Sequence, residues 1–435
     1  MSSGDSGSNN GKKLIPRNIL IPFIFLTSCF AWWGLANNMT DTLLAAFKKI
    51  MSMSDFQTSW IQIAFYGSYF CLALPAAIFI KKYTYKAGVL LGLGLFVLGS
   101  LLFYPASLTM NYFHFLIALY ILAGGLSILE TSANPYIFAM GSEETGTRRL
   151  NLAQSFNPIG SILGILLSKL FILSHLNNAS AQERAMMSAD KLKQIQSAEL
   201  SAVMGPYVTV AIILMILWLA IAFMKMPKIS DQGGKLDLIP TFKRLIKIRH
   251  YRWGVIAQFF YVGAQIGVWS FTIRYAMNAL KINEEAASSY YLASLILFSA
   301  SRFVSTWLMR YLTPARLLSL LSVLAMACTL GTIFGSGYFG VYCLIAISGC
   351  MSLMFPTIFG LSVRGLGDDT KIGGSGLIMA ILGGALLTAV QGQVSDGTGS
   401  IAMAYIVPLI CFIVIAYYSV YKSQQDLPKK NIAVT

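Results

Sequence analysis

The feature that most constrains the fold of this chain is a series of long apolar stretches separated by short polar segments. A helix needs about 20 apolar residues to cross the hydrocarbon core of a bilayer. Because lipid offers no hydrogen-bond partner to the backbone, each such stretch is predicted to be helical. The chain is therefore expected to be an all-α integral membrane protein. The twelve predicted spans are residues 19–47, 57–80, 87–106, 112–140, 150–173, 206–225, 253–279, 286–309, 315–336, 338–363, 372–393 and 401–421.

Composition and charge support this membrane environment. Only 11% of the residues are charged and 56% are hydrophobic, whereas soluble domains carry about 25% charged residues. A net charge of +15 would suggest a nucleic-acid partner for a soluble protein. Here, most Lys and Arg residues fall in segments that lie on one side of the membrane if the N-terminus is inside. The positive-inside rule explains that pattern, so we expect no nucleic-acid partner and assign both termini to the cytoplasm.

The longest basic segment divides the predicted helices six and six. We expect a disordered tail over residues 1–17, a six-helix bundle over 18–225, a cytoplasmic linker over 226–252, a second bundle over 253–421 and a tail over 422–435. The first apolar run has no small-residue cleavage site, so it is interpreted as a retained helix and not as a signal peptide.

The two halves also repeat one another in sequence. Pro135-Tyr136-Ile137-Phe138 is followed by Glu143-Glu144-Thr145, and Pro356-Thr357-Ile358-Phe359 is followed by Asp368-Asp369-Thr370. The two matches fall at corresponding places in the two halves. Parallel six-helix repeats of this kind are typical of secondary transporters.

Two carboxylates fall within predicted spans, Asp41 in the first and Glu130 in the fourth. Charged side chains are costly in a bilayer, so those that occur usually face a cavity and serve function. A buried carboxyl can also exchange a proton with each side in turn. Two structural alternatives remain: Asp41 could be solvated at the outer end of its helix, and Glu130 could form an ion pair with a buried arginine. The functional interpretation is favoured for both.

Amides and aromatic residues near these acids are candidate ligands for a sugar, whose hydroxyls need donors and acceptors and whose apolar face stacks on a ring. On the seventh predicted helix, four of them recur at spacings of three and four. Helix packing explains such a stripe more often than binding does, and the amides could equally join helices. The candidates, apart from Glu130 itself, are Asn38, Asn134, Gln154, Asn157, Gln258, Tyr261, Gln265 and Trp269.

Two arginines also lie within predicted spans. Arg302 could be the charge partner of a cavity acid or could bind the solute, whereas Arg274 is interpreted as reaching toward the outer surface. The six cysteines lie in apolar runs without metal-ligand spacing, and no nucleotide-binding or hydrolase motif is present. The sequence therefore predicts a transporter and not an enzyme, with no metal and no cofactor.

Five segments carry a family resemblance: Trp33-Gly34-Leu35-Ala36-Asn37-Asn38 with Asp41; Leu129-Glu130-Thr131 with Ala133-Asn134-Pro135; Leu150-Asn151-Leu152-Ala153-Gln154 with Phe156-Asn157; Ile248-Arg249-His250 through Gln265; and Phe355-Pro356-Thr357-Ile358-Phe359. Together they resemble the bacterial fucose:proton symporter family of the major facilitator superfamily. The resemblance covers residues 18 to 420 or so and keeps its spacing across both halves.

This resemblance implies two six-helix bundles that work by alternating access and carry L-fucose inward with a proton. The family's proton-coupling aspartate corresponds to Asp41, its sugar-contacting glutamate to Glu130, and a polar residue of its fifth helix to Asn157. A sodium-coupled symporter for glucose, galactose or N-acetylglucosamine remains an alternative, and a sugar receptor that does not transport is a remote one. We expect a monomer in the lipid bilayer of the bacterial inner membrane.

Overall fold

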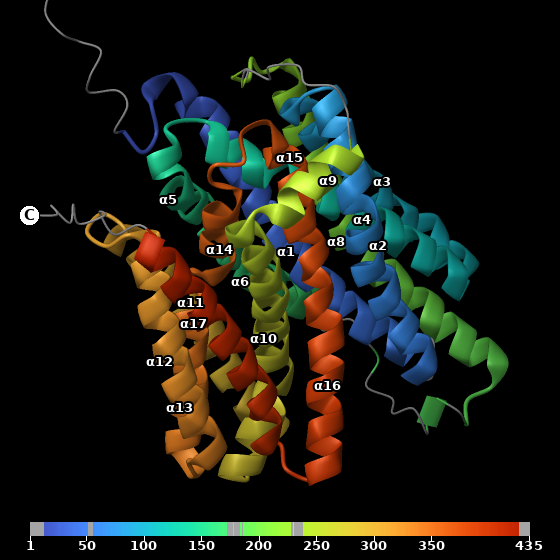
Figure 1. Cartoon of the computed structure of the whole chain (residues 1–435). Helices are drawn as coiled ribbons and strands as arrows, with labels where there is room; N and C mark the ends of the chain where they lie inside the picture. Colours follow the sequence, from blue (N-terminus) through green and yellow to red (C-terminus); the bar gives the residue numbers. More distant parts are fainter. Residues whose placement is uncertain are drawn as a thin grey trace, which may run out of the picture.

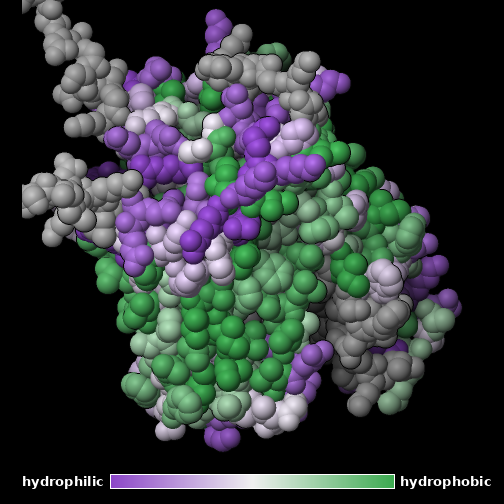
Figure 2. Space-filling model, viewed as in Figure 1, coloured by the Kyte–Doolittle hydropathy of each residue, from purple (hydrophilic) through white to green (hydrophobic). Residues whose placement is uncertain are grey.

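The computed structural model describes residues 13–50, 55–171, 177, 183–184, 186–227, 229 and 238–425. The side chains of residues 40–49, 55–59, 62 and 202–203 are outside this description. Within it, twelve helical segments are long and apolar enough to cross a membrane, and no residue is in a β-strand. The prediction of a twelve-span all-α membrane protein is confirmed. Figure 2 shows the broad apolar surface that such a protein presents to lipid, with hydrophilic residues gathered at one end.

The first half of the chain supplies six of the spans (Figure 1). Helices α5 and α6 together form the fifth of them. A 3-10 turn, η1 (Arg17–Ile19), precedes the first helix. The helices are α1 (Leu20–Ile50), α2 (Asp55–Lys82), α3 (Tyr85–Thr109), α4 (Tyr112–Ala139), α5 (Glu143–Gln154), α6 (Asn157–Phe171) and α8 (Ala189–Phe223).

The second half supplies the other six spans, preceded by a short helix on the surface, α9 (Leu238–Lys247). Helices α13 and α14 form one span, as do α15 and α16 with their 3-10 turns η3 (Gly367–Asp369) and η4 (Ala380–Leu382). The turn η5 (Met403–Tyr405) opens the last. The helices are α10 (Arg249–Leu280), α11 (Glu284–Leu308), α12 (Pro314–Phe334), α13 (Gly337–Met351), α14 (Met354–Val363), α15 (Thr370–Met379), α16 (Gly383–Thr398) and α17 (Ile406–Gln425).

Short polar residues at the predicted loops begin several helices. The side chain of Thr84 accepts a hydrogen bond from the backbone N–H of Ala87 at the start of α3, and Asn283 accepts one from Ala286 at the start of α11. Such caps satisfy backbone donors that a helix leaves free in its first turn. They explain why adjacent spans can be joined by loops of only a few residues.

Each half packs as its own bundle. In the first, α3 contacts α4 and α8, and α1 contacts α6; in the second, α10 contacts α16 and α17, and α12 contacts α13 and α17. Helices α1 and α6 come so close that a Cβ atom on Gly160 would lie 1.8 Å from the carbonyl oxygen of Ala31. Only a residue without a side chain permits this approach of the two helices, as is typical of helix packing in membranes.

The sixth span starts earlier than predicted. Its helix, α8, begins at Ala189 and not near residue 206, so it includes part of the segment predicted to lie between the fifth and sixth spans. The added turns are polar, which hid them from a hydropathy criterion, but they are held by specific contacts. Glu199 pairs with Arg184 (Nη1 to Oε2, 2.9 Å), and Gln196 donates to the carbonyl oxygen of Ile50 (2.6 Å).

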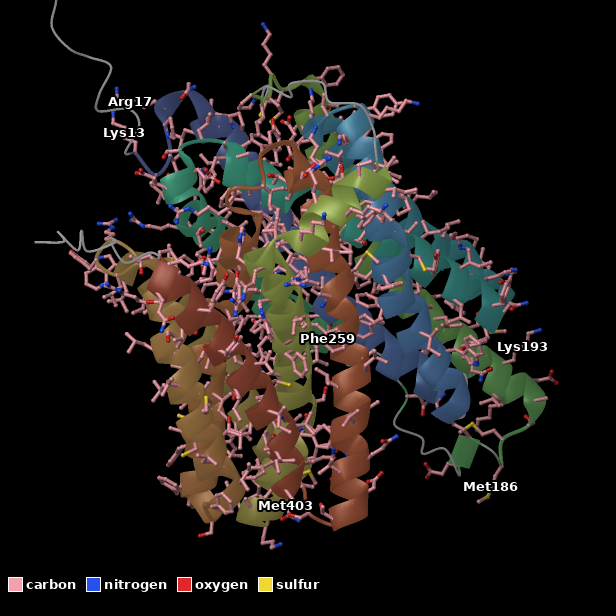
Figure 3. The ribbon with its side chains drawn as sticks, in the orientation of Figure 1. Lys13, Arg17, Met186, Lys193, Phe259 and Met403 are labelled. Atoms are coloured by element: carbon pink, nitrogen blue, oxygen red, sulfur yellow. The ribbon has the colours of Figure 1, made fainter. Side chains whose placement is uncertain are left out.

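The two halves meet mainly on the side where the chain's first helix begins, which we call the terminal side. Figure 3 shows Lys13 and Arg17 there, with Met186 and Met403 at the opposite end. On the terminal side, α2 contacts α15 and α5 contacts α14. Toward the opposite side, the ribbons of the two halves diverge (Figure 1).

Specific hydrogen bonds hold this contact together. The backbone N–H of Gly365 donates to Glu143 Oε1 (2.6 Å), and the amide of Asn151 donates to Thr357 Oγ1 (3.1 Å). These bonds join the first half to the second along α5. The structure therefore represents a conformation that is closed on the terminal side.

Candidate functional site

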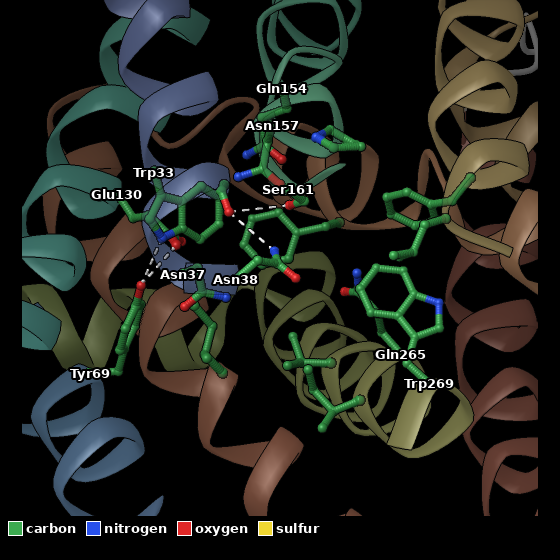
Figure 4. A pocket seen from close by; sticks show the side chains of 18 of the residues that line it. Trp33, Asn37, Asn38, Tyr69, Glu130, Gln154, Asn157, Ser161, Gln265 and Trp269 are labelled. Carbon is green, nitrogen blue, oxygen red and sulfur yellow. Dashed lines mark hydrogen bonds between the residues drawn. The ribbon is translucent and has the colours of Figure 1, made fainter. Parts of the chain in front are cut away.

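A cavity of about 140 Å³ lies between the two halves. Helices α1, α2, α4, α5 and α6 supply one wall, and α10, α11, α14 and η4 supply the other. Aromatic rings from both halves line it together with a set of polar side chains (Figure 4). These polar side chains, tyrosines aside, are Asn37, Asn38, Glu130, Gln154, Asn157, Ser161, Gln265 and Arg302.

A break in the fifth span brings its amides to this cavity. Helix α5 ends at Gln154 and α6 begins at Asn157, directly before Pro158. Proline has no N–H to donate, so it suits the first turn of the new helix. In membrane proteins, irregular backbone at this depth occurs where it is buried in protein or lines a cavity. The sequence predicts an unbroken helix here, and the break is what places Gln154 and Asn157 at the wall.

The tenth span contains a matching break. Helix α13 ends at Met351 and α14 begins at Met354, with Pro356 in its first turn. Backbone carbonyls near such a break lose their usual partners and need others. Both breaks therefore leave carbonyl groups available at the same depth, one in each half.

Arg302 on α11 donates hydrogen bonds to a backbone carbonyl at each of these breaks. Its Nη1 donates to the carbonyl oxygen of Gln154 (3.0 Å), its Nε donates to that of Ser352, and its guanidinium stacks on Phe298 at 4.6 Å. The side chain is only 3% exposed. The sequence suggests a charge partner for a cavity acid, but the bonds that the structure gives this arginine go to backbone carbonyls. Arg302 thus ties the halves together across the cavity.

Glu130 lies on the wall of the cavity, 2% exposed, as its position in the fourth span predicts. Tyr69 on α2 donates a hydrogen bond to its Oε1 (3.3 Å), and Trp33 on α1 donates from Nε1 to the Tyr69 hydroxyl (3.2 Å). The second oxygen, Oε2, is buried and has no hydrogen-bond partner among the described residues. No described arginine or lysine forms a salt bridge with this carboxyl.

The predicted amides of the first half fall at different depths. Gln154 and Asn157 line the cavity, and Asn157 donates to the carbonyl oxygen of Phe30 (3.3 Å). Asn134 is fully buried behind Gln154 and accepts a hydrogen bond from its Nε2 (2.8 Å). Asn134 therefore orients a cavity residue and does not line the cavity itself.

The predicted stripe on α10 divides into two parts. Gln265 and Trp269 line the cavity, and the indole N–H of Trp269 donates to Ser348 Oγ (3.2 Å). Gln258 and Tyr261 are fully buried nearer the terminal side and are not part of the lining. They lie between the cavity and the end of α10 on the terminal side.

The side chain of Asp41 lies outside the described residues. Its backbone continues α1 beyond Asn37 and Asn38, and both of these asparagines line the cavity. Asn38 also donates to the carbonyl oxygen of Gly34 (3.1 Å). The proton-coupling role of Asp41 stays a prediction.

Several lining residues were not predicted as ligands. Two of them, Tyr66 and Tyr69, are three residues apart on α2, a spacing that would have indicated a common face. Trp33 and Asn37 belong to a segment used above for the family resemblance only. Ser161 follows Asn157 by one helical turn and donates to the carbonyl oxygen of Gly34 (3.4 Å).

Comparison with known protein families identifies the architecture that holds this cavity. Residues 23–389 match the Major Facilitator Superfamily. The chain belongs to the major facilitator superfamily. Its two bundles, with polar residues gathered between them, fit the arrangement of this superfamily, in which the site lies at the interface of the repeats.

Two curated members of the superfamily are similar along almost their whole length. An L-fucose-proton symporter of Haemophilus influenzae is 40% identical over 418 residues, covering 93% of this chain and 97% of its own. An L-fucose-proton symporter of Escherichia coli is 40% identical over 413 residues, covering 94% of each chain. The family resemblance inferred from the sequence motifs is confirmed, and with it the prediction of a transporter and not an enzyme.

A solved structure shares the fold at the same level of similarity. It is the crystal structure of FucP, a major facilitator superfamily transporter, in the outward conformation, with a TM-score of 0.89 and 39% identity over 94% of this chain and all of that one. The predicted fold of two six-helix bundles is therefore confirmed.

Proposed function

We propose that this protein is a secondary active transporter that couples the uptake of L-fucose to the entry of a proton by alternating access. The observation that carries the proposal is Glu130, a buried carboxyl on the wall of a cavity that both halves build, with one hydrogen-bond partner among the described residues. The two similar L-fucose-proton symporters support the choice of sugar and of ion.

The lining of the cavity fits a monosaccharide. Gln154, Asn157 and Gln265 offer amide donors and acceptors to its hydroxyl groups. Trp33 and Trp269 offer rings to its apolar face from opposite halves. Because the lining is shared, the sugar contacts both bundles, and binding favours their movement around it.

In the proposed cycle, protonation of Asp41 neutralises the cavity and allows L-fucose to bind beside Glu130. The halves then close over the sugar and open on the terminal side, where sugar and proton leave. One charge moving through 100 mV provides about 2.3 kcal/mol. At a factor of ten for every 1.4 kcal/mol, this supports roughly 50-fold accumulation of a neutral sugar.

The basic segments support the remaining assignments, which are proposals too. We place both termini in the cytoplasm of a bacterium and the protein in its inner membrane, acting as a monomer. The terminal side is then cytoplasmic and the conformation is outward-facing. Residues 1–17, 226–252 and 422–435 are proposed as cytoplasmic tails and linker around bundles 18–225 and 253–421. Parts of all three lie outside the described residues.

Transport in proteoliposomes tests this function. With an inward proton gradient and no sodium, radiolabelled L-fucose should accumulate, and unlabelled L-fucose should compete better than glucose, galactose or N-acetylglucosamine. An unbuffered external medium should become more alkaline as L-fucose enters. Uptake that requires sodium, or that a hexose inhibits more strongly, would favour the sodium-coupled alternative. Binding without any uptake or exchange would favour a receptor.

The coupling role of Asp41 is tested by exchange. Asp41→Asn should abolish uphill accumulation but retain counterflow, because exchange of labelled for unlabelled sugar requires no net proton transfer. Glu130→Gln should weaken L-fucose binding as well, since its carboxyl lines the cavity. Continued accumulation by Asp41→Asn would show that another group carries the proton.

A further inference from the structure

Tyr69 occupies a position between two cavity residues that come from different helices. Its hydroxyl accepts a hydrogen bond from Trp33 Nε1 on α1 (3.2 Å) and donates one to Glu130 Oε1 on α4 (3.3 Å). All three residues line the same cavity, and Figure 4 shows the hydroxyl pointing at both neighbours. One oxygen atom thus joins a carboxyl group to an aromatic wall of the site.

The tyrosine is held firmly in this place. Its side chain is 2% exposed, its ring packs against that of Phe65 at 5.4 Å, and its backbone carbonyl accepts a hydrogen bond from Ser127 Oγ (3.1 Å). Ser127 lies on the same helix as Glu130, so α2 and α4 are fixed relative to each other next to the carboxyl. A change in the hydrogen bond to Glu130 is therefore expected to act on the Tyr69 hydroxyl itself, because the two helices are held in place around it.

The donor and acceptor roles follow from the chemistry of the three groups. An indole N–H can only donate, so the Tyr69 oxygen accepts from Trp33, and the hydroxyl proton is left for Glu130. A hydrogen bond to a carboxylate is about twice as strong as one to a neutral acceptor. Protonation of Glu130 weakens this bond. The Tyr69 oxygen then becomes a weaker hydrogen-bond acceptor for the Trp33 N–H, because linked hydrogen bonds polarise one another.

Few other ionisable groups of the described residues lie near Glu130. The described titratable or charged side chains that share its cavity or the small space behind it are Cys29 on α1, Tyr66 and Tyr69 on α2, and Arg302 on α11. Helices α3, α5 and α15 also pack on α4 and add no titratable side chain to either space. Arg302 donates to backbone carbonyls and the Cys29 thiol donates to that of Phe25. Tyr69 donates the hydrogen bond that Glu130 accepts within the described part of the chain.

We propose that Tyr69 is a positioning residue that transmits the protonation state of Glu130 to Trp33 on the sugar-binding wall. The ionised carboxylate draws the tyrosine hydroxyl toward α4, and the protonated carboxyl releases it. Trp33 follows because its N–H is bound to the same oxygen. This inference rests on the proposed participation of Glu130 in proton coupling, and it adds the path by which a proton changes the shape of the sugar site.

The first test reads the carboxyl directly, without sugar. In lipid nanodiscs, infrared difference spectra recorded across pH should contain a protonated-carboxyl band that disappears in Glu130→Gln. In Tyr69→Phe, which keeps the ring and loses the donor, the pH midpoint of this band should rise by about one unit or more, since a hydrogen bond to a charged group has been removed. The matched control is Tyr136→Phe, which removes a buried hydroxyl that donates to the carbonyl oxygen of Pro227 (2.8 Å). Its midpoint should equal that of the unchanged protein.

The second test reads Trp33. The chain has 7 tryptophans, so the ¹⁵N-indole resonance of Trp33 can be assigned as the one that Trp33→Phe removes. It should move with pH at the same midpoint as the Glu130 band, and it should lose that dependence in both Tyr69→Phe and Glu130→Gln. Retained near-normal thermal stability of Tyr69→Phe will show that the variant is folded.

The possible outcomes distinguish a failure of this inference from a failure of the proposed function on which it rests. An unchanged midpoint in Tyr69→Phe, or a Trp33 resonance that ignores pH while the Glu130 band titrates, would overturn the role of Tyr69 alone. A Glu130 band that does not titrate in the unchanged protein would overturn the participation of Glu130 in proton coupling, and the inference would fall with it.

Discussion

Arg302 performs a task that its charge alone does not explain. It reaches the carbonyl oxygens of Gln154 and Ser352, which belong to different halves and lie at helix breaks. Two buried carbonyls would each lose a partner without it, at a cost of about 1–3 kcal/mol for a group left unsatisfied. A planar guanidinium suits this task because it presents donors in a fixed fork.

We therefore expect Arg302→Lys to weaken L-fucose binding by about tenfold, although it keeps the positive charge. A lysine is a single point of charge and cannot hold both carbonyls in place. A tenfold weaker affinity corresponds to a loss of about 1.4 kcal/mol in the binding free energy. Isothermal titration of L-fucose into the purified protein measures the change.

A matched control for this substitution is present on α10. Arg274 is exposed and stacks on Phe271 at 4.2 Å, much as Arg302 stacks on Phe298 at 4.6 Å. Arg274→Lys should leave the affinity unchanged. If Arg302→Lys bound the sugar as tightly as the unchanged protein, its carbonyl contacts would have no bearing on the site.

Single residues were predictable where membrane burial made them costly. Glu130 and Gln154 were found because polar groups within apolar spans are rare. Tyr69 was missed because a tyrosine in an apolar helix is so often an ordinary packing residue. Tyr261 was predicted from a correct helical stripe, but its side chain is fully buried and its ring packs against that of Phe355 at 6.1 Å. Periodicity gives the face of a helix and does not say how far along it a cavity extends.

At the level of helices, hydropathy correctly predicted the number of spans but did not predict where two of them are interrupted. A window of about 20 residues averages over a break of two, so the interruption between Gln154 and Asn157 leaves no trace in it. Pro158 and Pro356 stand in the first turn after each break, where proline is well tolerated. Proline alone would not have located the breaks, because four other prolines lie inside continuous helices. The polar turns at the start of α8 were missed for the opposite reason, because their stability comes from contacts with distant residues.

At the level of the whole molecule, two basic side chains hold the terminal side closed in a symmetric way. Lys371 at the start of α15 donates to the carbonyl oxygen of Ile80, near the end of α2 (3.2 Å). Arg148 on α5 donates to that of Thr306, near the end of α11 (3.3 Å). In the two repeats, α5 corresponds to α15 and α2 to α11. Each half therefore supplies one cation to the negative end of a helix dipole in the other half.

This arrangement makes the closed terminal side sensitive to either cation. We expect Lys371→Met to shift the protein toward a conformation open on the terminal side by about fivefold, because a cation at the end of a helix contributes on the order of 1 kcal/mol in a partly buried place. Pulsed electron paramagnetic resonance between spin labels on the terminal ends of the two halves should show a longer distance gaining population.

The first bundle offers an internal control for this prediction. Lys86 donates to the carbonyl oxygens of Ala222 (2.7 Å) and Met224 (2.8 Å), so it caps the end of α8 from within the same half. Lys86→Met removes an equivalent charge from an equivalent helix end and should leave the distance between the halves unaltered. Equal shifts in the two variants would mean that general destabilisation, and not the bond between the halves, sets the conformational balance. A shift confined to Lys371→Met would mean that opening this side requires the bond to Ile80 to break.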